Sequence, residues 1–207
     1  TQAIRIDTFW AWFKSAQMEI ERAYLAGDAG FLAGQLTPRV HSIEARLNWE
    51  IGPYYDPDLT LVFSPSVREN IDLAIRVTVA APEIPNWHFL PAKPPKTMTS
   101  LVMRLPFGSE AEICADDWCY RVTAYNNCEF FDIEVFSKAP VCVKESDLLL
   151  LTHLLIEALV GEVTYLERIG AVTVYRPSDP RTRERTTALR FLGEHLASLL
   201  ENGSGDS

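Results

Sequence analysis

The longest apolar run of this sequence, LLLLTHLLIEALV at residues 148–160, constrains the fold more than any other feature. A threonine, a histidine and a glutamate interrupt the run, which is shorter than the roughly 20 residues that a helix needs to cross a bilayer. The pattern therefore predicts a core helix. We expect Ser146 or Asp147 to cap this helix and Gly161 to end it.

Aromatic residues near the N-terminus, in the stretch FWAWF, recur at helical spacing. Asp7 is the expected N-cap of this helix, and Gly27 marks its end. Because Phe9, Trp10 and Phe13 share one face of such a helix, we predict that they belong to a core. An exposed aromatic stripe that binds a partner is the alternative interpretation.

Three more helices are indicated by caps and by the spacing of apolar residues. The second helix is expected to begin at Thr37, with Pro38 in the first helical position and a shorter turn of helix before it. Ser64 and the proline after it predict the start of a third helix, which runs to Ala81. Leucines between residues 189 and 200 predict a final amphipathic helix.

Stretches of alternating polarity predict strands. LNWEIG and LTLVFS, joined by Asp-Pro-Asp, predict a hairpin, and SLVMRLPF, YRVTAY and FFDIEVF predict an antiparallel meander with a turn at Asn126 and Asn127. IGAVTVY predicts one further strand. We therefore expect an α+β fold with a largely antiparallel or mixed sheet covered by helices. It forms a single domain over residues 6–201, with a candidate subdivision near 92–98 and a disordered tail at 202–207.

The proline-rich stretch AAPEIPNWHFLPAKPPK spans residues 80–96. Pro82 and Pro85 end the preceding helix and turn the chain, and NWHFL is short enough for a strand. Since proline donates no backbone hydrogen bond, Pro91 is expected to end the pairing or to mark an edge strand. The remaining residues predict an extended crossing. A PxxP ligand of the type that SH3 domains bind is the less favoured alternative.

The charge of the chain is acidic and unevenly distributed. The formal net charge is -9, and residues 97–147 carry 9 acids against 4 bases. An acidic surface repels phosphate backbones and anionic lipids, so neither nucleic acid nor a membrane is an expected partner. A basic protein is the partner that this charge attracts.

Cysteine usage and the N-terminal residues bear on the compartment. Cys114, Cys119, Cys128 and Cys142 match neither paired CxxC zinc knuckles nor a redox CxxC motif. Reduced, partly buried thiols are favoured over disulfides and over a metal site. The N-terminus lacks the pattern of a signal peptide, which predicts a cytoplasmic protein.

Several motifs together resemble a family of uncharacterised bacterial proteins. They are FWAWF, LNWEIGP before a hairpin, LVFSPS before a helix, VAAPEIPNWHFLPAKPPK after it, and ALVGEVTYLERIG late in the chain. The resemblance spans most of the chain and implies the order of its elements, but no activity. By analogy alone, small acidic proteins of this kind resemble immunity proteins, which neutralise a toxin.

No catalytic signature is present at convincing spacing. The sequence has no GxSxG, no HExxH and no glycine-rich loop between a strand and a helix. The best catalytic candidates are Glu50, Glu162 and His88, which would make a small hydrolase-like enzyme if the fold brought them together. The alternative is that each of them caps or pairs locally. No catalytic residue, metal or cofactor is predicted.

The segment CADDWCYRVTAYNNCEFFDIEVF combines acids with aromatic residues, and this composition suits a protein interface. An ordinary half-buried sheet is the alternative. We predict a non-enzymatic binding protein, and as its specific form an immunity protein that neutralises a basic toxin; a homo-oligomeric structural protein is a further alternative. The predicted partner-binding residues are Asp116, Asp117, Trp118, Tyr120, Glu129, Phe130, Asp132 and Glu134.

Overall fold

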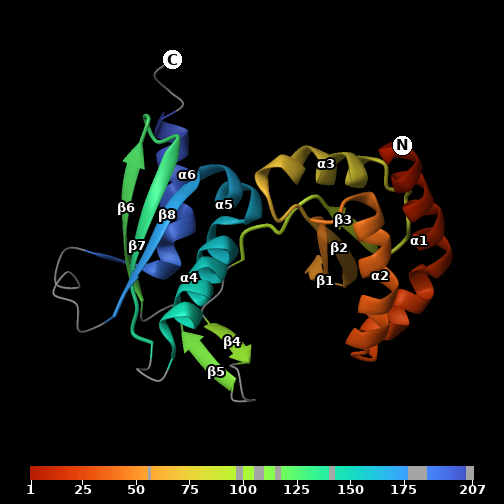
Figure 1. Cartoon of the computed structure of the whole chain (residues 1–207), viewed down its shortest axis with the longest axis horizontal. Helices are drawn as coiled ribbons and strands as arrows, with labels where there is room; N and C mark the ends of the chain where they lie inside the picture. Colours follow the sequence, from red (N-terminus) through yellow and green to blue (C-terminus); the bar gives the residue numbers. More distant parts are fainter. Residues whose placement is uncertain are drawn as a thin grey trace. The chain divides into compact units, whose positions relative to one another are not determined.

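The computed structural model describes residues 1–55, 57–96, 100–104, 110–114, 118–139, 143–176 and 186–203. The chain forms two compact units, Thr1–Lys93 and Pro94–Ser207, whose boundary lies within the stretch 92–98 named above. Each unit combines helices with its own sheet or sheets, so the expected α+β class is confirmed (Figure 1).

The first unit has a three-stranded mixed sheet with the strand order β1-β2-β3. β1 and β2 form the predicted antiparallel hairpin, and β3 runs parallel to β2 because α3 carries the chain across between them. The short strand predicted within NWHFL is β3, which lies at the edge of this sheet. The elements are α1 (Gln2–Leu25), α2 (Ala29–Ile43), β1 (Asn48–Tyr55), β2 (Asp58–Ser64), η1 (Arg68–Asn70), α3 (Ile71–Val79) and β3 (Trp87–Leu90).

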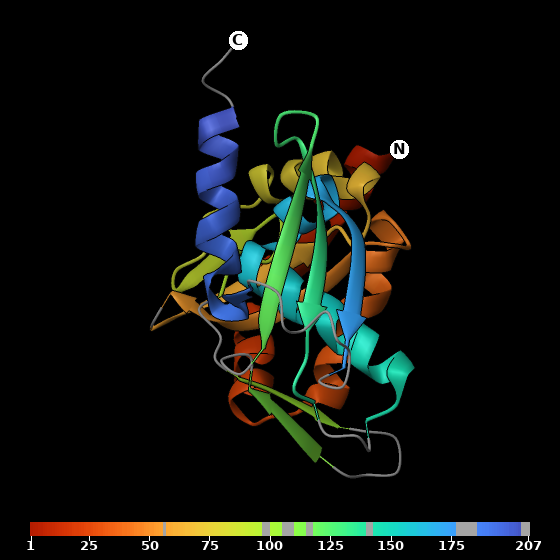
Figure 2. The ribbon, with the colours of Figure 1, turned by 90° about the vertical axis from the view of Figure 1, so that its left-hand side faces the viewer.

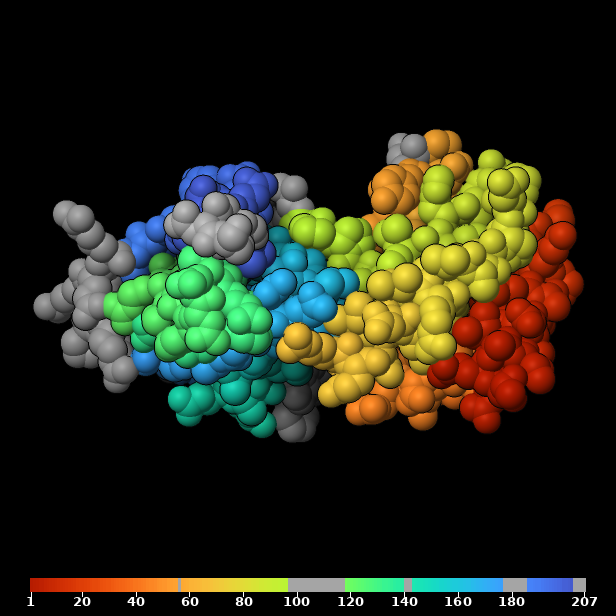
Figure 3. Space-filling view, turned by 90° about the horizontal axis from the view of Figure 1, so that it is seen from above, coloured from red at the N-terminus to blue at the C-terminus, as the bar shows by residue number. Residues whose placement is uncertain are grey.

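Aromatic side chains of α1 form the centre of the first unit's core. Trp10 and Phe13 are buried and contact Phe89 with ring centroids 4.7 Å and 5.7 Å away. The Trp10 indole Nε1 donates a hydrogen bond of 2.8 Å to the carbonyl of Val77 in α3. Figure 3 shows α1, in red, lying against α3, in yellow. The aromatic face of α1 is therefore core, as predicted, and not an exposed stripe.

Two helix starts in the first unit differ from the expectation. α1 begins at Gln2 rather than at Asp7, which is exposed within the helix. α2 begins at Ala29, because Asp28 caps it by accepting a 2.9 Å hydrogen bond from the backbone N–H of Phe31. The expected start at Thr37 was therefore wrong.

The third helix is also shorter than predicted. Ser64 belongs to β2, and Ser66 has a positive φ of 60°, which no helical residue adopts. The chain then makes the single 3₁₀ turn η1 before α3, and α3 ends at Val79. The helix therefore starts after a turn rather than at Ser64.

The second unit contains two separate sheets. β4 and β5 form an antiparallel pair, and a four-stranded sheet has the order β8-β7-β6-β9, in which only β7 and β8 are parallel. The elements are β4 (Ser100–Arg104), β5 (Glu110–Cys114), β6 (Cys119–Tyr125), β7 (Phe130–Phe136), α4 (Glu145–Val160), α5 (Glu162–Arg168), β8 (Ile169–Tyr175), β9 (Thr187–Ala188), η4 (Leu189–Phe191) and α6 (Leu192–Gly203).

The apolar helix predicted at 148–160 is α4, the central helix of the second unit. Leu151, Leu155 and Ile156 are fully buried in one cluster with the inward side chains of β6 and β7. Leu192 and Leu196 of α6 belong to the same cluster. Figures 1 and 2 show α4 and α6 on one side of the four-stranded sheet. The prediction of a core helix is thus confirmed.

Several details of the second unit correct the expectation. β4 pairs with β5 and not with β6, so the predicted three-stranded meander was wrong. α4 begins at Glu145 without a side-chain cap from Ser146 or Asp147, and α5 was not predicted. α6 continues through Gly203, which places the first two residues of the expected disordered tail in a helix. Residues 204–207 lie outside the described residues.

Two other local predictions are confirmed. Asn126 and Asn127 adopt positive φ angles of 51° and 55° in the turn between β6 and β7. Gly161, with φ of 82°, ends α4. Its Cα lies against the chain entering this unit, because an added Cβ would come within 2.8 Å of Pro95 Cδ.

Taken one by one, the described helices fall short of a membrane span. No single helix among them is long and apolar enough for one. The pair α4 and α5 meets the criteria only when the two are joined across a 113° bend. The core position of α4 already accounts for its apolar composition.

Helix packing in the second unit depends on Gly193 in α6. A Cβ added to Gly193 would lie 2.5 Å from the carbonyl oxygen of Leu159 in α4, whereas one added to Gly34 in α2 would meet nothing within 4 Å. We predict that Gly193→Ala lowers the free energy of unfolding by about 1–3 kcal/mol, because the two helices must move apart. Urea denaturation followed by circular dichroism measures the change.

Gly34→Ala is the matched control. It places a methyl group on a helical glycine with free space around it, so we expect it to raise stability by about 0.5–1 kcal/mol. A Gly193→Ala protein that is at least as stable as the unsubstituted chain would show that the α4 and α6 contact tolerates a methyl group.

Candidate functional site

The four-stranded sheet of the second unit has one covered face and one open face. Side chains alternate along its strands, and Phe131, Ile133 and Val135 point into the core below the helices. No described helix lies over the opposite face, which is turned toward the viewer in Figure 2. We call this the open face; its residues are Arg121, Thr123, Tyr125, Phe130, Asp132, Glu134, Phe136, Thr173 and Tyr175.

The carboxylate of Glu134 is held at both oxygens. Its Oε2 lies 2.6 Å from Arg121 Nε on β6, and its Oε1 accepts a 3.1 Å hydrogen bond from the Tyr175 hydroxyl on β8. The Glu134 hydrogen bond is the main reason that the pKa of Arg121 is raised. The guanidinium also lies 5.7 Å from the ring of Phe136, against which the Tyr175 ring stacks at 5.3 Å. Three strands thus contribute to one ordered group.

Asp132 occupies an irregular position in the pairing of β7 with β8. The register shifts between Phe131 and Ile133, and Asp132 Oδ1 accepts a 2.7 Å hydrogen bond from the backbone N–H of Ala171. A Cβ on the adjacent Gly170 would lie 2.5 Å from that same oxygen. A hydrogen bond with Asp132 also raises the pKa of Tyr125 on β6. Asp132 therefore links all three long strands.

The structure places the predicted partner-binding residues in three different settings. Trp118 and Tyr120 are 1% and 2% exposed, so they belong to the core and not to a surface. Their selection as surface residues was wrong, because Tyr120 points to the helix side of the sheet. Asp116 and Asp117 lie outside the described residues.

The other predicted residues do lie on or beside the open face. Phe130, Asp132 and Glu134 alternate along β7 on this face, and the exposed Glu129 is in the turn that precedes them. Sequence reasoning missed Tyr125, which is 46% exposed and is paired with Phe130 across the hairpin. The predicted turn at Asn126 and Asn127 fixes which residues pair across the hairpin, so this turn was the signal that could have identified Tyr125 as the partner of Phe130.

The residues of the alternative enzyme hypothesis are locally paired. Glu50 on β1 accepts a 2.7 Å hydrogen bond from the Tyr54 hydroxyl, and His88 on β3 lies 3.0 Å from Asp58. β2 runs between β1 and β3, so the backbones that carry Glu50 and His88 are about 10 Å apart. Glu162 belongs to the second unit, where it is 2% exposed at the start of α5. Among the described residues of the first unit, Glu50 and His88 thus form no shared acid–base site.

Histidine, cysteine and acidic side chains of the described residues are the candidates for metal binding. No three histidine, cysteine, aspartate or glutamate side chains of these residues converge as metal ligands. Cys119 and Cys128 are free thiols in this structure. Cys114 and Cys142 are not described at the side-chain level.

Two tyrosine–histidine pairs stabilise the second unit. The Tyr120 hydroxyl lies 2.8 Å from His195 Nδ1 in α6, and burial raises the pKa of Tyr120 to about 12. The Tyr165 hydroxyl in α5 lies 2.6 Å from His153 Nδ1 in α4. Burial lowers the pKa of His153, so its imidazole is favoured in the neutral form. His153 therefore joins α4 to α5 through its hydrogen bond with Tyr165, which fits the boundary of a core.

Comparison of the chain with protein-family models, with curated proteins and with solved structures found no match. The resemblance to uncharacterised bacterial proteins therefore stays a prediction.

His153 makes stability dependent on pH. The unfolded chain binds a proton near the ordinary pKa of about 6.5, whereas the folded chain binds it only at lower pH. We therefore predict that the free energy of unfolding falls as pH drops from about 6.5 through the folded pKa, and that His153→Gln reduces this fall. Urea denaturation between neutral and mildly acidic pH measures the slope.

Tyr165→Phe serves as the control. It removes the hydrogen bond to His153 but keeps the burial, so the slope is expected to persist because burial is the cause of the shift. An NMR titration that gave His153 a pKa at or above its ordinary value would contradict this explanation.

Proposed function

We propose that this chain is a non-enzymatic protein-binding protein and that the open face of its second unit holds the partner. The observation that supports this most is a sheet face without a described helix over it, on which polar and aromatic side chains are already ordered. Ordering of side chains before binding lowers the entropic cost of association.

Tyr125 is the anchor of this proposed interface. It is 46% exposed, and a hydrogen bond with Asp132 raises the pKa of its hydroxyl. Tyrosine is among the residue types that contribute most to binding when a partner buries them. Phe130, paired with Tyr125 across the hairpin, extends the apolar area beside it.

Charge favours a basic partner. Arg121 offsets the charge of Glu134. Glu129 and Asp132 add further carboxylates closer to the hairpin turn between β6 and β7. The segment 97–147 that contains them has 9 acids against 4 bases. Such an excess accelerates the approach of a basic protein. Neutralisation of a basic toxin in the bacterial cytoplasm is the specific form of this function that we propose.

Substitution of Tyr125 tests the surface. The proteins encoded beside this gene are tested first as partners, by co-purification with the tagged chain, and binding is then measured by calorimetry. We predict that Tyr125→Ala weakens binding by about 2 kcal/mol or more, which is roughly 30-fold, because the anchor is lost. Tyr55→Ala, which removes an equally exposed tyrosine from the first unit, is the control.

Charge reversal tests the steering. Glu129→Lys is expected to slow association at low salt, whereas Glu194→Lys in α6, on the covered side of the sheet, leaves it unchanged. Equal affinities for Tyr125→Ala and Tyr55→Ala, together with equal association rates for the two lysine variants, would place the interface elsewhere.

A further inference from the structure

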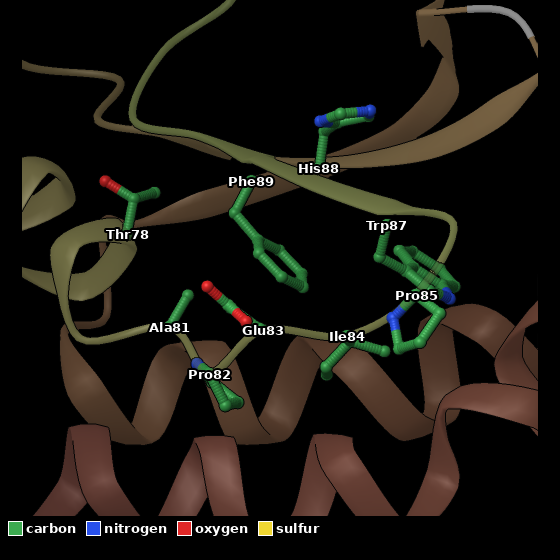
Figure 4. Close-up of a pocket in the computed structure, with 9 residues that line it drawn as sticks. All are labelled: Thr78, Ala81, Pro82, Glu83, Ile84, Pro85, Trp87, His88 and Phe89. Atoms are coloured by element: carbon green, nitrogen blue, oxygen red, sulfur yellow. The ribbon is translucent and has the colours of Figure 1, made fainter.

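The first unit contains a hollow of about 600 Å³ between strand β3 and the loop formed by residues 81–85. Trp87 and Phe89 of the strand form one wall, and Glu83 and Ile84 of the loop form the other (Figure 4). His88 points to the opposite side of the strand. All of the lining residues belong to the first unit, so the hollow is independent of the open face.

The aromatic wall of this hollow is rigid, and its exposed part is the ring of Phe89, because Trp87 is buried in the core of the first unit. The rings of Trp87 and Phe89 are nearly parallel, with an interplanar angle of 8° and centroids 6.4 Å apart. Phe13 of α1 packs edge-on against both rings, with centroid distances of 5.0 Å to Trp87 and 5.7 Å to Phe89, and thereby fixes their positions. The partly exposed ring of Phe89, held in this way, attracts a cation or an apolar stem without first having to be ordered.

The edge of β3 offers backbone hydrogen bonds beside the hollow. Of the described strands, only β2 pairs with β3, and the Leu59 N–H donates to the carbonyl of Asn86. With the parallel register, this bond turns the backbone of His88 toward β2 and the N–H and C=O of Phe89 toward the free edge. A segment that paired with Phe89 would direct alternate side chains into the hollow.

The loop wall adds a negative charge. Glu83 is exposed and lines the same hollow as Phe89. A cationic side chain lying between them would meet the carboxylate at one end and an aromatic face along its stem. Pro85 and Pro91 stand on either side of β3 and limit the length over which a second strand pairs.

We propose that β3 and this hollow bind a short extended segment of a partner protein, which pairs with the backbone of Phe89 and inserts a lysine or arginine between Glu83 and the aromatic wall. This is recognition by strand addition, in which the backbone supplies affinity and the hollow supplies selectivity. The site stands whether or not the open face of the second unit binds a partner.

The blocked peptide Ac-Thr-Val-Lys-Val-Thr-NH₂ is the probe, added to the full chain. We expect it to bind with a shift of the Phe89 amide resonance in NMR spectra. A second peptide with norleucine in place of lysine lacks the positive charge. In a third peptide, the backbone nitrogens of the lysine and of the following valine are both methylated, so that each edge of the bound segment loses one hydrogen-bond donor. Each change is expected to weaken binding by about tenfold or more.

Two matched variants test whether Glu83 supplies the negative charge that binds the lysine. Glu83→Gln is expected to weaken binding of the lysine peptide by about tenfold, whereas Glu69→Gln, at an exposed acid of the same unit away from the hollow, leaves it unchanged. The proposal is overturned if the lysine peptide leaves the Phe89 amide unshifted up to its solubility limit. It is also overturned if the N-methylated peptide binds equally well, or if the two glutamine variants bind alike.

Discussion

The packing of Trp10 and Phe13 against the sheet is the contact on which the first unit depends. These two side chains touch β2 through Phe63 and β3 through Phe89 and Trp87, and Trp10 also holds the end of α3 by its hydrogen bond to Val77. A four-residue edge strand has too few ladder bonds to be stable by itself. The aromatic cluster therefore fixes both the strand and the shape of the hollow beside it.

The second unit differs, because no helix among its described residues lies over one face of its four-stranded sheet. The covered face is secured by α4, whose leucines interdigitate with β7. On the open face, Asp132 and Glu134 take the place of an apolar layer by linking β6, β7 and β8 through hydrogen bonds. A sheet stabilised in this way keeps fixed side chains at its surface, which is the property that a binding surface needs.

The sequence was informative where an element was long and its apolar period was clear, as for α1, α4, β6 and β7. It misled where one local signal had two meanings. Pro38 resembles the first residue of a helix, yet it lies inside α2, where the Arg39 guanidinium donates to the nearby carbonyl of Gln35. α5 has only seven residues and no side-chain cap, and β5, for which no strand was predicted, pairs with β4. α5 packs against α4, β7 and β8, and no local sequence pattern reveals these contacts.

For the candidate site, too, the sequence predicted some residues correctly and others wrongly. Alternation identified Asp132 and Glu134 as neighbours on one face, but it gives no means to decide which face of β6 is buried when both carry aromatics, and so Tyr120 was misplaced. Tyr175 joins Glu134 only through a parallel pairing between strands far apart in the chain.

The prolines around β3 have a further consequence. An exposed strand edge invites identical chains to stack on one another, and growth of this kind leads to fibrils. Pro85 and Pro91 interrupt the edge after four residues, and neither supplies a donor for a growing ladder. The protein thus combines an accessible edge with a built-in barrier to its own aggregation.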